Sequence, residues 1–259
     1  MPIRKPERHS FRVTLAPMSQ RDHASTLEKW TTSGKEGLPP VLAATVILLR
    51  DGSTGLETLM LRRNSKIVFG GMWVFPGGRL DPKDWEGVDE GDELGASRRA
   101  AEREAIEETG LEIDPRQMLP FSHWTPPPIT PKRFLTWFFV ARAGDGRVEI
   151  DHGEIHESDW MSAAEALRRQ RAQEIELAPP TFVTLSELSV WSSVDEALAS
   201  VGDRVPERFQ TRISVVEDVG PVTLWHGDAG YEQSDATVEG PRHRLTMTKG
   251  GPWRYDRTP

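Results

Sequence analysis

The run REAIEETGL at residues 103–111 constrains this chain more than any other feature, because three of its carboxylates can meet at one point. If the run is helical, Glu104, Glu107 and Glu108 stand at i, i+3 and i+4, side by side on one face. Like charges packed this closely repel, which weakens the helix and raises carboxylate pKa values. A divalent cation against the face would remove both costs, and Mg²⁺ and Mn²⁺ take oxygen ligands.

The residues ahead of this run decide between two interpretations of it. Taken alone, a glutamate-rich helix surface is most often solvated, since Glu is a good helix former. Here, however, an apolar segment at residues 73–75 leads into Pro76, Gly77 and Gly78, a turn that glycine makes easily. A strand, a glycine turn and an acidic helix in succession form a coherent site, and they favour the functional interpretation.

Together these segments resemble the signature of the Nudix hydrolase family, G-x5-E-x7-R-E-U-x-E-E-x-G-U, in which U is aliphatic. The second half matches in register from Arg103 to Gly110 and Leu111. The first half departs, because Arg103 follows Gly78 by 25 positions (103 − 78) where the signature has 14, which leaves 11 extra residues. The residue eight before Arg103 is Gly95, where the signature has Glu.

The extra residues indicate a variant of the family with a long insert. We expect Asp81, Asp92 or Glu93 to replace the missing glutamate, and residues 82–94, rich in acidic and turn-forming residues, to form a surface loop. FPGG followed by xLD and an extended loop resembles the subgroup that includes coenzyme A diphosphatases. Later segments up to Leu188 resemble the same subgroup, so the likeness covers residues 39–188.

The resemblance implies an α/β Nudix fold, with a mixed β-sheet sandwiched between helices. We expect the Nudix hydrolase domain at residues 39–203, a loosely ordered N-terminal extension at 1–38 and a β-rich C-terminal extension at 204–259. Hydrophobic patterns and turn residues predict strands at 41–50, 56–63, 73–75, 134–141, 222–225 and 243–248. They predict a helix that carries the second half of the Nudix signature, here called the box helix, with its glutamates the box glutamates. It begins within residues 92–97, packs through Ala100, Ala101, Ala105 and Ile106, and stops at Gly110. Further helices are predicted after Ser162 and Ser193.

The resemblance also assigns roles to individual residues. It implies that Glu104, Glu107 and Glu108 hold Mg²⁺ or Mn²⁺ with the backbone carbonyl of Gly77. Arg103 is spaced to pair with Glu107 at i+4 and to orient it. The general base is a box glutamate or a loop carboxylate, Glu154 or Glu157. Candidates for substrate contact are Arg79, which we favour as the phosphate ligand, Gly78 and Arg62. Arg63 and Lys66 are further cations nearby in the sequence. Trp124 or Trp137 is a candidate for stacking against an adenine.

These roles point to metal-dependent hydrolysis of a diphosphate linkage in a nucleoside diphosphate derivative, with coenzyme A or an acyl-coenzyme A as a candidate. Diphosphatases for ADP-ribose or dinucleotides are alternatives within the same class. A Nudix-like nucleotide-binding or regulatory module without catalysis is the alternative from another class, because fold does not fix function. The presence of all three glutamates weighs against that module.

Composition excludes several other classes. A net charge of −8 argues against a groove that binds nucleic acid by bulk electrostatics, so we expect a small-molecule partner. Without cysteine, the chain has no disulfide or thiolate site. The longest strongly apolar stretch, residues 41–49, is far shorter than the roughly 20 residues of a membrane span. We expect a cytoplasmic protein without a membrane anchor, and a homodimer is possible.

Overall fold

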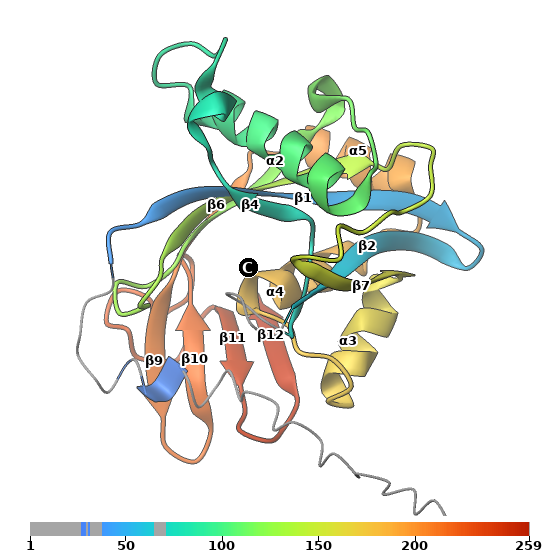
Figure 1. Ribbon diagram of the computed structural model, residues 1–259. Helices are drawn as coiled ribbons and strands as arrows, with labels where there is room; N and C mark the ends of the chain where they lie inside the picture. Colours follow the sequence, from blue (N-terminus) through green and yellow to red (C-terminus); the bar gives the residue numbers. More distant parts are fainter. Residues whose placement is uncertain (1–26, 30, 32–37, 65–70, 259) are drawn as a thin grey trace, which may run out of the picture.

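Two β-sheets form the framework of the chain in the computed structural model, which describes residues 27–29, 31, 38–64 and 71–258 (Figure 1). The larger sheet has the order β3-β2-β1-β6-β5-β8, with β4 paired to β1 and β7 paired to β2. Its strands are β1 (Val41–Gly52), β2 (Gly55–Arg63), β3 (Trp73–Val74), β4 (Gly77–Arg79), β5 (Leu119–Thr125), β6 (Phe134–Arg142), β7 (Ile155–Met161) and β8 (Glu207–Gln210). The smaller antiparallel sheet consists of β9 (Arg212–Val216), β10 (Gly220–Leu224), β11 (His243–Met247) and β12 (Trp253–Arg257).

Four longer helices and two short 3₁₀ helices connect the strands between residues 71 and 258. They are η1 (Pro82–Trp85), α2 (Glu93–Thr109), η2 (Pro115–Gln117), α3 (Ala163–Arg171), α4 (Pro179–Leu188) and α5 (Val194–Gly202). Within the described part of the chain, no helix is long and apolar enough to cross a membrane.

Strand β1 lies at the centre of the larger sheet and buries side chains on both of its faces. Ala44, Val46 and Leu48 point to the face covered by α2. Ile47 and Leu49 point to the opposite core, which α3, α4, α5 and part of the smaller sheet complete. Because strand side chains alternate, an apolar run on both sides of the pleat needs cover on both faces. Figure 1 shows α2 on one side and α4 with β9 to β12 on the other, which confirms the predicted sandwich.

Several predicted boundaries are confirmed because local chemistry sets them. Helix α2 begins at Glu93 and is capped by Gly110, whose φ of 70° is left-handed. The hydroxyl of Ser162 accepts a hydrogen bond from the Glu165 backbone N–H at 3.2 Å and so begins α3. The equivalent bond from Glu196 to Ser193 begins α5.

The packed side of α2 differs from the prediction at one residue. Ala100, Ala101 and Ala105 are buried as expected, but Ile106 is 41% exposed. Glu108 is buried instead, because it reaches the backbone of Gly77 on β4. Since neighbouring helical residues point about 100° apart, a face that includes positions 101, 105 and 108 turns position 106 outward.

The C-terminal residues complete the main core. Strand β8 pairs in parallel with β5, and Phe209 on β8 stacks on Trp124 with ring centroids 3.8 Å apart. Trp225 lies edge-on to both rings and is fully buried. The domain boundary near residue 204 stays a prediction. The predicted N-terminal extension lies mostly outside the described residues, although Leu27 is described and packs into this core.

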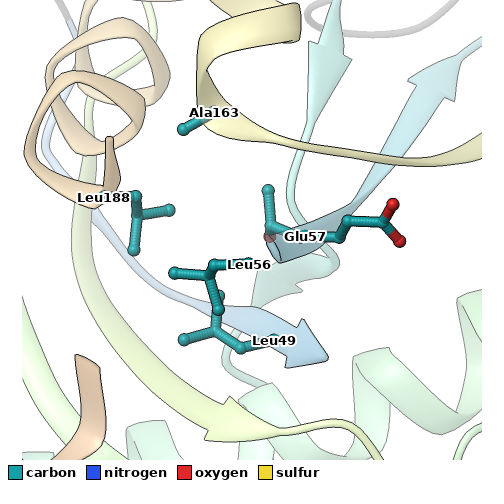
Figure 2. A pocket seen from close by; sticks show the side chains of 6 residues that line it. Leu49, Leu56, Glu57, Ala163 and Leu188 are labelled. Atoms are coloured by element: carbon teal, nitrogen blue, oxygen red, sulfur yellow. The ribbon is translucent and has the colours of Figure 1, made fainter. Parts of the chain in front are cut away.

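A small apolar pocket lies where the β1–β2 hairpin meets α3 and α4 (Figure 2). Leu49, Leu56, Ala163 and Leu188 line it, while the carboxylate of Glu57 points away and pairs with Arg50 at 2.7 Å. No box glutamate belongs to its lining. The pocket is therefore a gap in core packing and is separate from the candidate site.

A buried ion pair holds the loop between β10 and β11 to β11. The Asp228 carboxylate accepts hydrogen bonds from Nε and Nη2 of Arg244, at 2.6 and 2.5 Å. It also accepts bonds from the backbone N–H groups of Gly230 and His243, each at 2.9 Å. The Asp228 side chain is fully buried, so its oxygens depend entirely on these donors.

Replacing Asp228 with Asn should lower the free energy of unfolding by about 3–5 kcal/mol, because Arg244 would be left as an unpaired buried charge. Urea unfolding of the full chain measures this loss. Glu232→Gln is the matched control, since Glu232 pairs with Arg212 at 3.3 Å but its side chain is 71% exposed. Its effect should stay within about 0.5 kcal/mol. Equal losses in both variants would contradict the special role of Asp228.

His243 should make stability depend on pH. Its Nδ1 lies 2.8 Å from the carbonyl oxygen of His226, and its Nε2 lies 3.2 Å from the hydroxyl of Tyr255. A neutral ring that donates from Nδ1 and accepts at Nε2 fits these partners. Burial lowers the pKa of His243 below its usual 6.5. The folded state therefore binds fewer protons than the unfolded state between the two pKa values, so stability is complete above 6.5 and falls as pH drops toward the folded pKa.

Unfolding free energies measured from about pH 7.5 to about pH 5 should therefore show a smaller decline for His243→Gln than for the wild type. His152→Gln provides the control, because His152 is exposed. Parallel declines in the wild type and His243→Gln would show that this histidine does not contribute to acid sensitivity.

Candidate active site

Close approach between β4 and its neighbours creates the site. Gly77 lies opposite Thr45 and Gly78 opposite Ala44 in the pairing with β1. A Cβ on Gly77 would come within 2.4 Å of the Ala44 carbonyl oxygen, and a Cβ on Gly78 within 2.3 Å of Glu104 Oε1. Because the closest contact of Gly77 is with backbone, only glycine lets the strand lie this close to β1, whereas a side chain at Gly78 would displace the Glu104 carboxylate.

Arg103 joins the helix to the segments that precede it. Its Nε and Nη2 donate to the two carboxylate oxygens of Asp84, at 3.1 and 2.9 Å, in a bidentate pair. Its Nη1 donates to Glu104 at 2.8 Å and to Glu107 at 3.1 Å, so the predicted i+4 pair is present. Nη2 also donates to the Arg79 carbonyl at 3.0 Å. These hydrogen bonds, that to Asp84 above all, raise the pKa of Arg103 further above its usual range.

We expected Asp81, Asp92 or Glu93 to replace the missing signature glutamate, whereas the structure pairs Asp84 with Arg103 through two hydrogen bonds. Asp84 follows Gly78 by six positions (84 − 78), which is the Gly-x5-Glu spacing of the Nudix signature. Burial raises the pKa of Asp84, but hydrogen bonds from Arg103 and the Asp81 backbone outweigh it and lower the pKa overall. Counting forward from the glycine would have found this residue, whereas counting back from Arg103 led to Gly95. The extra residues thus lie after Asp84.

Of the three residues that we named instead, Asp92 and Glu93 have other partners, and Asp81 makes only a long ion pair with Arg103. Asp81 Oδ2 is 4.0 Å from Arg103 and its side chain is 52% exposed. Asp92 caps α2 by accepting from the Gly95 backbone at 2.9 Å. Glu93 accepts from the indole N–H of Trp137 at 3.1 Å. The insert was also expected wholly on the surface, but the Asp84 side chain is buried because it meets Arg103.

Glu108 is the most deeply placed of the box glutamates. Its Oε2 accepts a hydrogen bond from the Gly77 backbone N–H at 2.9 Å. Its Oε1 is buried and has no hydrogen-bond partner among the described residues. Burial raises the pKa of Glu108 to about 8, against the opposing effects of Gly77 and Arg63. A buried carboxylate oxygen without a donor calls for an additional partner.

Arg63, at the end of β2, brings a loop carboxylate to the box. Its Nη2 donates to Glu154 Oε2 at 2.5 Å, and its Nη1 donates to the Gly77 carbonyl at 3.4 Å. The pairing of β2 with β7 shifts between Arg62 and Arg63. Arg62 instead pairs with Glu157 at 3.3 Å, where both side chains are about half exposed. The structure therefore brings Glu154 to the box through Arg63 and places Glu157 with Arg62.

The other predicted contacts differ in accessibility. The side chains of Arg79 and Glu107 are exposed, and Glu107 also lies 3.5 Å from Lys83. Both candidate tryptophans are buried, Trp124 against Phe209 and Trp137 below Glu93, so neither offers an open ring face. Lys66 lies outside the described residues.

The donor set fits a hard divalent cation. The side chains of Glu104 and Glu108 and the Gly77 carbonyl supply oxygen only, which Mg²⁺ and Mn²⁺ prefer. Burial raises the pKa of Glu104 as well, with a contribution from the like charges of Glu107 and Glu154. Among the described residues, no three acidic or histidine side chains converge into a complete ligand group as they stand. Each carboxylate is turned to an arginine or a backbone N–H, and the unpartnered Glu108 Oε1 is the oxygen that a cation would satisfy.

A comparison with protein families shows to which family the chain belongs. The model of the NUDIX domain matches residues 39–182, which is more than half of the chain. The chain belongs to the NUDIX domain family. This confirms the expected enzyme class, a hydrolase that acts on pyrophosphate bonds.

A solved structure shows the same fold. A NUDIX hydrolase from Alicyclobacillus acidocaldarius is 23% identical over 62% of this chain and 96% of its own, with a TM-score of 0.56. This alignment therefore covers under two thirds of the present chain. The chain is also similar to a MutT protein from Methanosarcina mazei Go1, 20% identical over 64% of this chain and 97% of its own, with a TM-score of 0.43.

Asp84→Asn should lower the free energy of unfolding of this Nudix protein by about 1–3 kcal/mol, because it removes the charge that receives two hydrogen bonds from Arg103. Thermal or urea unfolding measures the loss. Asp81→Asn is the control and should change stability by no more than about 0.5 kcal/mol, since Asp81 is more exposed. A larger effect at Asp81 would instead favour Asp81, one of the residues that we first expected to replace the signature glutamate.

Proposed function

We propose that this Nudix protein hydrolyses the diphosphate linkage of a nucleoside diphosphate derivative with Mg²⁺ or Mn²⁺, and that coenzyme A or an acyl-coenzyme A is its substrate. The observation that carries the proposal is the placement of Glu108 against Gly77, beside Glu104 on the same helix. The other carboxylate oxygen of Glu108, Oε1, is buried and has no hydrogen-bond partner among the described residues, which supports its role as a ligand.

The chemistry requires negative charge to be neutralised before water can attack a diphosphate. A bound divalent cation supplies that neutralisation and lowers the pKa of water. Glu104, Glu107 and Glu108, with the Gly77 carbonyl, would hold the cation. Glu104 and Glu107 both accept hydrogen bonds from Arg103 Nη1, so one guanidinium orients two of these carboxylates.

Glu154 is our candidate for the general base. It lies near enough to raise the pKa values of both Glu104 and Glu108, and Arg63 holds its carboxylate at 2.5 Å. Its side chain is 59% exposed, so water can reach it. Glu157 is the less favoured candidate, because its ion pair is with Arg62. Arg79 is our candidate for contact with a substrate phosphate, which its exposure at the end of β4 beside Gly78 supports.

The choice of coenzyme A rests on the insert. The extra residues follow FPGG, Leu80 and Asp81, and this arrangement resembles the coenzyme A diphosphatase subgroup. The net charge of −8 supports a small-molecule substrate over nucleic acid. A cytoplasmic location and a homodimer stay predictions from the sequence.

A substrate panel with Mg²⁺ or Mn²⁺ tests the proposal. Coenzyme A should yield 4′-phosphopantetheine and adenosine bisphosphate, measured by chromatography of the products. Glu107→Gln and Glu108→Gln should each lower kcat/KM on the order of a hundredfold or more, because each removes an oxygen ligand that stabilises developing charge. Glu102→Gln, on the same helix but outside the site, should leave the rate unchanged.

Two outcomes would overturn the proposal in different ways. Cleavage of ADP-ribose to AMP with no action on coenzyme A would replace the substrate. If the wild type bound a compound of the panel but cleaved none, the site would be a nucleotide-binding module without catalysis.

A further inference from the structure

Arg63 lies among three acceptors of the candidate site. Its Nη2 donates to Glu154 at 2.5 Å, its Nη1 donates to the Gly77 carbonyl at 3.4 Å, and Nη1 is 3.8 Å from Glu108 Oε1. The Arg63 side chain is only 17% exposed, so solvent screens its charge poorly. One guanidinium therefore faces two carboxylates and a backbone carbonyl.

Two of these three acceptors are oxygen atoms that a divalent cation would also bind as ligands. The Gly77 carbonyl and Glu108 Oε1 belong to the oxygen set described above, and Oε1 has no hydrogen bond to Arg63 or any other described residue. A cation on these oxygens would stand at close range to Nη1. Because both carry positive charge, the cation and the guanidinium exclude one another from this position.

The two arginines of the site are held in different ways. Arg103 is fixed by the buried carboxylate of Asp84 and by the Arg79 carbonyl, neither of which belongs to the oxygen set. The shortest bond of Arg63 goes to Glu154, an exposed side chain on the loop before β7, and Arg63 Nε has no hydrogen-bond partner among the described residues. Arg63 is therefore the arginine that can move when a cation arrives.

We propose that Arg63 is a built-in counter-ion that competes with the divalent cation for the Gly77 carbonyl and Glu108. This inference rests on the proposed function, because it assumes the same metal site. Binding of the cation moves Nη1 off these two acceptors while Nη2 keeps Glu154. The released N–H groups then lie beside the cation, where they can donate to an oxygen of the diphosphate.

The test measures metal binding without substrate, so that catalysis does not enter. Mn²⁺ alone is titrated into the full chain after chelator treatment, and free Mn²⁺ is followed by electron paramagnetic resonance. Arg63→Gln should bind Mn²⁺ about fivefold or more tightly than the wild type, which corresponds to roughly 1 kcal/mol. Arg62→Gln is the matched control. It removes the same charge at the neighbouring position, where the Arg62 side chain pairs with Glu157. Its affinity should stay within about twofold of the wild type.

The sign of the change separates competition from support. If Arg63 merely held the site together, Arg63→Gln would bind Mn²⁺ more weakly or equally well, and either result overturns the inference. Arg63→Met keeps the partly buried stem and should show the same gain, while unfolding curves confirm that both variants fold. Absence of Mn²⁺ binding in the wild type and in both Arg63 variants would instead remove the metal site, and with it the proposed function.

Discussion

The arrangement of the candidate site depends on the guanidinium of Arg103. This group joins Asp84 in η1, the Arg79 carbonyl on β4 and two glutamates of α2. Its charge is shared among several carboxylates in a partly buried network, where each member satisfies the others. An incomplete network of this kind is costly, because the remaining charges are neither solvated nor paired. The strand, the 3₁₀ turn and the helix therefore take their positions together.

Glu108 follows a different physical rule from its two neighbours. Glu104 and Glu107 accept hydrogen bonds from a charged side chain, whereas Glu108 accepts one from a backbone N–H and has Arg63 only at 3.8 Å. Its burial raises its pKa to about 8, so the site holds a carboxyl group whose charge must be stabilised from outside the helix. The same helix face thus carries two glutamates that are paired with Arg103 and a third, Glu108, with one oxygen that has no hydrogen bond among the described residues.

The sequence was sufficient where structure is set by local chemistry. The end of α2 at Gly110, the serine caps and the β1–β2 hairpin depend on residues a few positions apart. The face shared by the glutamates follows from helical spacing alone. Asp84 was missed as a replacement for the signature glutamate because an insert of unknown position makes the counts from the two ends of the signature disagree, and only the burial of Asp84 against Arg103 favours the count from the glycine. The different partners of Arg62 and Arg63, Glu157 and Glu154, follow from a shift in pairing at the end of β2 that cannot be read from residue types.

Long-range packing could not be predicted from the sequence for another reason. Trp124 was considered as a stacking surface for a ligand, yet its ring is covered by Phe209 and Trp225, which lie roughly a hundred positions later. Contacts this distant in the chain close large loops and leave no local pattern. They also fix an order of events during synthesis. Strand β5 has neither its parallel partner nor its aromatic cover until β8 and β10 have left the ribosome. A nascent chain that already carries all of α2 therefore still lacks the cover of Trp124, so its main core can be completed only after β8 and β10 have been synthesised.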